Sequence, residues 1–188
     1  REDKKFTNQT LMKQADLESQ EIEELEKRIA SQTPAAGKLL LDQTKFSKFS
    51  DFPISSLTMK GLNRGRFITC TEIQRQTLFH ALAGRDILGA AKTGSGKTLA
   101  FLIPLMEVLF RNKASRDDLN IIFGLVVSPT RELATQIFEV AKVLKSNHMF
   151  NVGLLVGGED FNSLKNLQLA IGTPGRILQH LEQTPEFD

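Results

Sequence analysis

A glycine-rich segment, residues 91–98, constrains the fold more than any other part of the 188-residue chain. It reads Ala-Lys-Thr-Gly-Ser-Gly-Lys-Thr and lies between a short apolar run, residues 86–90, and an amphipathic stretch that begins at Thr98. Such a turn between a buried strand and a helix is typical of a P-loop, where backbone N–H groups and the helix N-terminus surround phosphate oxygens. We therefore predict an α/β fold with a parallel sheet and a nucleotide site at the start of that helix.

The residues of this turn have separate expected roles. Gly94 and Gly96 let successive N–H groups turn inward, Lys97 reaches the terminal phosphates, and the Thr98 hydroxyl is the candidate Mg²⁺ ligand. Lys97 and Thr98 are thus the candidate catalytic residues. The residues expected to bind the nucleotide phosphates are Ala91, Thr93, Gly94, Ser95, Gly96, Lys97 and Thr98. Ala91 stands where the strict pattern has Gly, and a glycine-rich turn without a ligand is the alternative.

Short apolar runs alternate with amphipathic stretches from Phe46 onward, which indicates βαβ units and a parallel sheet with helices on both faces. The expected strands are 86–90, 121–128, 152–156 and 168–171, and the expected helices are 72–83, 98–110, 131–145 and 175–183. Pro104 should disturb the second helix locally, because proline cannot donate a hydrogen bond to the carbonyl of Ala100.

The N-terminal part differs from the rest. Residues 10–30 read as a charged helix with a narrow apolar stripe, and residues 31–37, which contain Pro34 and Gly37, read as a linker. We predict a helical extension with its linker over residues 1–45 and a domain over residues 46–188. The helix either docks on the body or on a partner, or it is a solvated tail. The stripe consists of Leu11, Ala15, Ile22, Leu25 and Ile29.

Charge and composition exclude several classes of protein. The net charge is +2, and residues 1–30 hold six basic and eight acidic residues, so the body is the more basic part. No apolar run approaches the ~20 residues that span a bilayer, so no membrane partner is expected. A single cysteine, Cys70, cannot form an internal disulfide. The three histidines show no metal-ligand spacing, and we expect them at the surface.

Four segments in fixed order resemble the motifs of DEAD-box RNA helicases. They are residues 91–98, the run Pro-Thr-Arg-Glu-Leu-Ala at 129–134, the pair Gly157-Gly158, and Thr-Pro-Gly-Arg at 173–176. The resemblance implies the first RecA-like domain of an ATP-dependent RNA helicase, with ATP and Mg²⁺ as cofactors. The amino-acid sequences of residues 89–102 and 176–181 are most similar to those of the subgroup that acts in small-ribosomal-subunit assembly and 18S rRNA processing. That similarity implies pre-ribosomal particle proteins as partners and a nuclear, nucleolar location.

The family's adenine-reading element is matched by Phe67, Thr71, Ile73 and Gln74, with Phe49 as the isolated aromatic residue upstream. The Gln74 amide can donate and accept at once, which suits an adenine edge, and Phe49 could stack on the ring. Arg66 and Cys70 replace the Gly and Pro of the family pattern. Without the other motifs, Gln74 would read as a surface amide and Phe49 as a core aromatic.

Two further turns should lie at the rim of the sheet where parallel strands end. Each combines a helix N-terminus, a hydroxyl and an arginine, so together with Gly158 they could hold one RNA strand by its phosphates, independently of sequence. The resemblance assigns RNA contacts to Pro129, Thr130, Arg131, Gly158, Thr173, Gly175 and Arg176. Helix capping by the threonines and surface ion pairs of the arginines are the alternative for either turn alone.

The Asp-Glu-Ala-Asp motif, the Ser-Ala-Thr motif and a second RecA-like domain with its arginine fingers are not in these 188 residues. The resemblance therefore implies that this chain by itself binds ATP weakly and hydrolyses it negligibly, because phosphoryl transfer depends on those positioned charges. Two other functions stay open at this point: a P-loop ATPase or kinase of another class, and a non-catalytic RNA-clamping scaffold.

Overall fold

The fold is organised around a three-stranded parallel sheet. Its strands are β1 (Gly124–Val127), β2 (Val152–Leu155) and β3 (Leu169–Gly172), in the order β1-β3-β2. The computed structural model describes residues 2–38, 45–113, 121–158 and 166–183, with side chains from residue 12 onward. Val127 and Leu155 both lie opposite Gly172, so the three strands end at one level.

Helices cover both faces of this sheet, as predicted. On one face, Leu169 and Ile171 of β3 join the main core with α5 (Arg131–Leu144). On the other, Ala170 packs in a smaller cluster with Ile177 of α6 (Pro174–Gln183). This alternation is the two-residue period of a strand buried on both sides. The α/β class predicted from the sequence is confirmed.

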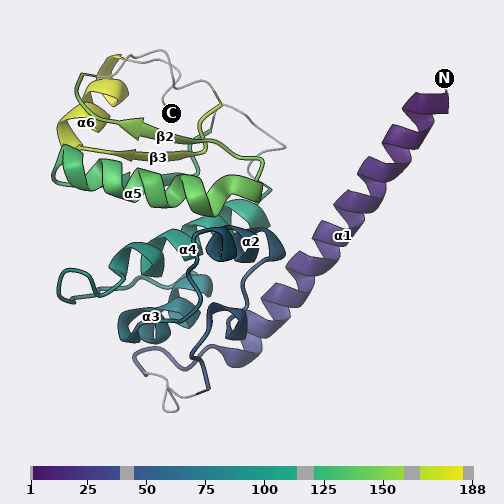
Figure 1. Ribbon diagram of the computed structural model, residues 1–188, viewed down its shortest axis with the longest axis horizontal. Coiled ribbons are helices and arrows are strands. Elements are labelled where there is room, and N and C mark those ends of the chain that lie inside the picture. Colours follow the sequence, from purple (N-terminus) through teal and green to yellow (C-terminus); the bar gives the residue numbers. More distant parts are fainter. Residues whose placement is uncertain (1, 39–44, 114–120, 159–165, 184–188) are drawn as a thin grey trace.

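Three more helices lie beyond α5, on its side away from the sheet (Figure 1). They are α2 (Ser56–Arg64), α3 (Glu72–Leu82) and α4 (Lys97–Arg111), and two short 3₁₀ turns span Phe49–Asp51 and Lys145–Asn147. The sequence pattern did not predict α2. Its start is nevertheless marked by Ser55, whose hydroxyl accepts a hydrogen bond from the Thr58 N–H at 3.3 Å.

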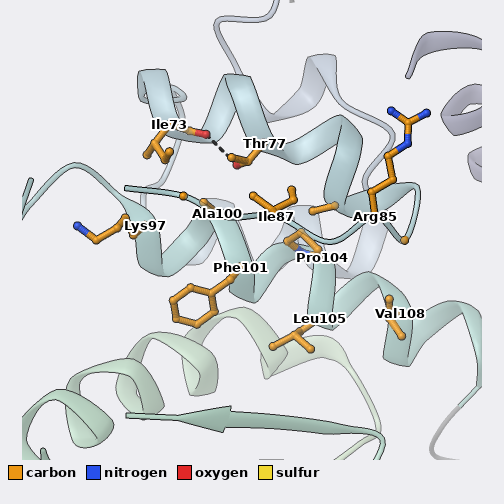
Figure 2. A pocket seen from close by; sticks show the side chains of 13 residues that line it. Ile73, Thr77, Arg85, Ile87, Lys97, Ala100, Phe101, Pro104, Leu105 and Val108 are labelled. Atoms are coloured by element: carbon orange, nitrogen blue, oxygen red, sulfur yellow. Dashed lines mark hydrogen bonds between the residues drawn. The ribbon is translucent and has the colours of Figure 1, made fainter. Parts of the chain in front are cut away.

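The predicted strand at residues 86–90 is wrong, because this segment is not part of the sheet. Leu88 is fully exposed and Ile87 is 40% exposed, and among the described residues β1 pairs only with β3. A strand depends on backbone hydrogen bonds to a neighbour, and none of the described strands lies beside this segment. Instead, the segment forms one wall of an apolar pocket of about 460 Å³, together with α3 and α4 (Figure 2).

The expected disturbance at Pro104 does not interrupt its helix. The α4 helix continues from Lys97 to Arg111 with Pro104 inside it and buried. Proline removes one hydrogen bond, the one to Ala100, while Leu102, Ile103 and Met106 are fully buried in the core around it. The packing of α4 thus outweighs the local cost of the proline.

The N-terminal helix docks on the body, which decides between the two readings left open above. The α1 helix spans Glu2–Gln32, and Leu25 and Ile29 near its end are buried. The Glu21 carboxylate accepts hydrogen bonds from the backbone N–H of Ser56 (2.5 Å) and its hydroxyl (3.2 Å), so it caps the start of α2. The beginning of α1 extends away from the body (Figure 1). The side chain of Leu11, predicted in the stripe, lies outside the described residues.

Hydrogen bonds also fix the segment after α1. Arg85 donates to the carbonyl of Pro34 and to Nδ1 of His80, both at 2.7 Å. Because a guanidinium only donates, Nδ1 accepts, so the proton is on Nε2, which donates to the carbonyl of Lys38 at 2.9 Å. The expected linker is therefore held against the end of α3. The boundary predicted between residues 45 and 46 follows residues 39–44, which lie outside the described part of the chain.

Candidate functional site

The glycine-rich turn leads directly into α4, as the P-loop prediction requires. Gly94 and Gly96 have φ angles of +79° and +91°, which only glycine adopts without strain. No side chain caps the start of α4, and its first turn contains no acidic residue. The N–H groups there are therefore available to an anion.

The Lys97 ammonium lies across this turn. It donates to the carbonyl of Lys92 at 2.9 Å and, in a shorter contact, to the carbonyl of Ala91. The loop carbonyls thus hold the positive charge at the turn that is expected to receive phosphate. A phosphate group would replace these carbonyls as the partner of Lys97.

A hollow of about 490 Å³ adjoins the turn, between the start of α3 and the P-loop. Within the described part of the chain the buried Ser95 hydroxyl has no hydrogen-bond partner, so it can donate to a phosphate oxygen. Thr98 follows at the second residue of α4, the position whose hydroxyl would hold Mg²⁺ in a P-loop. The residues that line the hollow are Thr71, Glu72, Ile73, Gln76, Ala90, Ala91, Lys92 and Ser95.

Gln74 is brought to the P-loop, but its amide already has partners. The side chain is 2% exposed, its oxygen accepts from the Thr71 N–H, and its NH₂ donates to the Gly96 carbonyl, both at 2.9 Å. Thr71 and Gln74 form the capping box of α3. Gln74 therefore couples α3 to the phosphate loop, and a base contact would exchange these hydrogen bonds.

Phe49 lies in the core, at 1% exposure, and offers no open ring face in this conformation. Its backbone N–H donates to the carbonyl of Ile68 at 3.3 Å, which ties the 3₁₀ turn to the segment before α3. The expected stacking of Phe49 on adenine is therefore not supported by this structure, whereas the core role left open above is.

The three turns predicted to contact RNA do lie side by side at one rim of the sheet. The Ser128 N–H donates to the Gly172 carbonyl at 2.8 Å, and the Thr173 N–H donates to the Leu155 carbonyl at 3.0 Å. The turns after β1, β2 and β3 thus follow adjacent strand ends. This rim holds Pro129, Thr130, Arg131, Gly158, Thr173, Gly175 and Arg176.

Within this rim, the threonine and arginine side chains differ in their surroundings. The Thr130 hydroxyl caps α5 by accepting from the Leu133 N–H at 3.2 Å. Arg131 is exposed, whereas Arg176 is half-buried and donates to the Gln179 side chain at 2.8 Å. Capping by Thr130 thus occurs as the alternative reading expected, and it leaves Arg131 pointing into the rim.

A buried polar network that the sequence did not reveal connects α2, α4 and the segment before β2. The Glu107 carboxylate, 1% exposed, accepts from the Ser55 N–H (3.0 Å) and hydroxyl (2.7 Å). The Thr58 hydroxyl in turn contacts Nε2 of His148 at 3.0 Å. Burial raises the pKa of the Glu107 carboxyl, against the lowering effect of these hydrogen bonds.

The expectation that all three histidines lie at the surface is wrong. His148 is 8% exposed and lies 4.8 Å from the ring of Phe150, and His180 is 1% exposed on the inner side of α6. Burial, and next the charge of Lys145, lowers the pKa of His148 to about 4. Burial and Arg176 lower the pKa of His180 as well. Only long-range packing distinguishes such histidines from surface ones.

His148 should make the fold labile in acid. Its pKa is lower in the folded than in the unfolded chain, so its contribution is complete above about pH 6.5 and decreases as the pH falls toward 4. The full difference is at most about 3 kcal/mol in the free energy of unfolding. Urea unfolding at pH 7.0, 5.5 and 4.5 should show His148→Gln losing less stability than the wild type over this range. Parallel curves for the two proteins would contradict the role of His148.

The remaining features exclude some chemistry from the described residues. Burial raises the pKa of the Cys70 thiol to about 12, which leaves it unreactive in the core. Across the described ranges, no three or more His, Cys, Asp or Glu side chains are grouped so that they could hold a metal ion. No helix in that part of the chain combines the length and apolar character needed to cross a membrane.

A parallel sheet with a phosphate loop and three clustered turns at its rim defines a P-loop nucleotide-binding α/β domain. Residues 71–188 match the family model described as "DEAD/DEAH box helicase". The chain belongs to this family, which excludes a P-loop ATPase or kinase of another class.

Two relatives and one solved structure show the extent of the similarity. The chain is 50% identical over 146 residues to the ATP-dependent RNA helicase DBP4 of Yarrowia lipolytica, covering 76% of this chain and 20% of that protein. It is 45% identical over 175 residues to DBP4 of Kluyveromyces lactis, covering 91% and 22%. The structure of Mss116p bound to ssRNA and AMP-PNP aligns with a TM-score of 0.67 at 31% identity, covering 78% of this chain and 32% of that one. The chain thus spans about one fifth of the length of these relatives.

Proposed function

We propose that this chain is the nucleotide-binding and RNA-contacting part of an ATP-dependent RNA helicase. The observation that carries the proposal is the joint presence of a P-loop at α4 and three adjacent turns with Arg131 at the rim of the sheet. The relatives at 45–50% identity are named ATP-dependent RNA helicases, and the Mss116p structure holds ssRNA and a nucleotide analogue.

In this function the P-loop and the rim of the sheet bind different ligands. The N–H groups of the P-loop and the Lys97 ammonium bind the phosphates of ATP. Thr98 would hold Mg²⁺, which when bound would neutralise phosphate charge. The rim turns hold one RNA strand by its backbone, without reading bases. Because ATP and RNA are held by separate parts of one domain, the P-loop at α4 and the rim of the sheet, binding of both can set the position of a second domain.

We further propose that the RNA is pre-rRNA of the small ribosomal subunit, that proteins of the pre-ribosomal particle are partners, and that the protein acts in the nucleolus. The amino-acid sequences of residues 89–102 and 176–181, which resemble that subgroup of the family, support this proposal. An affinity-tagged protein should co-purify with 18S rRNA precursors from nucleolar extracts. Recovery of unrelated RNA alone would contradict it.

The test of the helicase proposal is ATP turnover and duplex separation by the natural full-length protein, with and without RNA. RNA-stimulated turnover supports a helicase. If the protein binds RNA but turns over no ATP with any RNA tested, a non-catalytic clamping scaffold is favoured instead.

Base selectivity should depend on Gln74. In Gln74→Ala, the affinity for ATP should fall about tenfold, because the adenine edge loses the amide that would pair with it. The affinity for GTP should hardly change. Nucleotide titrations of both proteins provide the measurement.

A second variant separates the two contacts of Gln74. Gln74→Glu keeps an acceptor for the Thr71 N–H, so α3 should stay capped, but it has no donor for Gly96 or for adenine. Its unfolding midpoint should fall, because the buried carboxylate would face the Gly96 carbonyl, and its ATP affinity should fall while its GTP affinity hardly changes. Equal losses of ATP and GTP affinity in both variants would assign Gln74 a purely structural role.

A further inference from the structure

The Arg131 side chain and the turn after β2 are in direct contact. A methyl group placed on Gly157 would lie 2.6 Å from Nη2 and 3.3 Å from Cζ of Arg131. Both distances are shorter than ordinary van der Waals contact, so the guanidinium rests on Gly157 where any other residue would carry its Cβ. No comparable contact exists at Gly158, where a methyl group would meet none of the described residues within 4 Å.

This contact joins two turns that follow strands which are not neighbours in the sheet. Arg131 follows β1 and Gly157 follows β2, and these strands lie on opposite sides of β3. Two strand spacings separate them, about 10 Å. The Arg131 side chain therefore reaches from the turn after β1 to the turn after β2. An arginine in that place can make paired hydrogen bonds to a phosphate.

We infer that Gly157 is a positioning residue for Arg131, and that its missing side chain sets where the guanidinium meets an RNA phosphate. The inference rests on the proposed RNA-binding function of the rim. Gly157 does not have a positive φ, so alanine is compatible with its backbone. The added methyl group would displace the end of a flexible, exposed side chain and leave the fold intact.

Gly158 provides the matched control. Its φ is +94°, so alanine there strains the turn, but the added methyl group does not touch Arg131. Gly157→Ala should therefore change the position of Arg131 without changing stability, and Gly158→Ala should lower stability without moving Arg131. The two neighbouring substitutions separate positioning from turn geometry.

The experiment is a double-mutant cycle on the natural full-length protein with a non-hydrolysable ATP analogue. Gly157→Ala, Arg131→Ala and the double variant are titrated with unrelated single-stranded RNAs at several salt concentrations. We expect each single variant to lose three- to tenfold in affinity for every RNA, with a salt slope flatter by ~0.7. The double variant should bind no more weakly than Arg131→Ala, and the unfolding midpoint of Gly157→Ala should be unchanged.

Additive losses would overturn the inference, since Gly157 would then act independently of Arg131. Unchanged RNA affinity in Gly157→Ala would overturn it too. A second readout does not depend on RNA: the Nε–H NMR signal of Arg131 should shift in Gly157→Ala and stay in place in Gly158→Ala. If the wild-type protein fails to bind RNA, the proposed function fails, and this signal still decides whether Gly157 positions Arg131.

Discussion

Replacing Lys97 with alanine should reduce RNA-stimulated ATP turnover of the full-length protein by at least about 10²-fold. Its ammonium is the cation that the structure holds across the P-loop, on the carbonyls of Ala91 and Lys92. Without it, the charge that develops on the terminal phosphates loses its nearest positive partner. Steady-state ATPase assays with saturating RNA provide the measurement.

Lys60→Ala is the control for a lost surface charge, because Lys60 is exposed on α2, outside the P-loop. It should turn over ATP at the wild-type rate, and the thermal unfolding of both variants should match the wild type. If Lys97→Ala keeps turnover within threefold of the wild type, the phosphate-binding role of the loop is refuted.

Replacing Gly61 with alanine should have the largest effect on stability. In most helices this change stabilises by up to about 1 kcal/mol. Here the added methyl group would lie 2.8 Å from the Cα atom of Leu144, and closer still to its carbonyl oxygen, at the end of α5. Backbone cannot move aside as a side chain can, so α2 must separate from α5. We expect a loss of about 2–3 kcal/mol in the free energy of unfolding, measured in urea.

Gly175→Ala tests the same substitution in a helix with open space, since no residue that the structure describes lies within 4 Å of the added methyl group in α6. Its stability should equal or exceed that of the wild type. A neutral Gly61→Ala would mean that α2 and α5 do not approach as closely as the structure indicates.

Helices, strands and the phosphate loop were predicted where a periodicity or a motif within one short stretch of sequence indicates them. The helices α3, α4, α5 and α6 occur within a residue or two of their predicted bounds, and three of the four expected strands form. The P-loop glycines have the positive φ angles that their role requires. In each case the periodicity or the motif lies within one short stretch of chain.

The predictions that failed concern relations between distant segments. Residues 86–90 have a strand-like composition, but a strand also needs a neighbour, and composition does not supply one. The buried state of His148 depends on Thr58, ninety residues away, and that of Phe49 on a core gathered from the whole domain. For Gln74, the spacing indicated the right place, but the hydrogen bond to Gly96 only became visible in the fold.

The β1 strand has a practical consequence for handling this protein. Leu125 and Val127 are 46% and 55% exposed, and one edge of β1 has no strand beside it among the described residues. An open edge with apolar side chains and no lysine or proline within the strand is a template for a strand of another molecule. The light scattered by preparations of these 188 residues should therefore rise more steeply than in proportion to their concentration. Storage at low concentration, or a solubilising fusion partner, should reduce association through the open edge of β1.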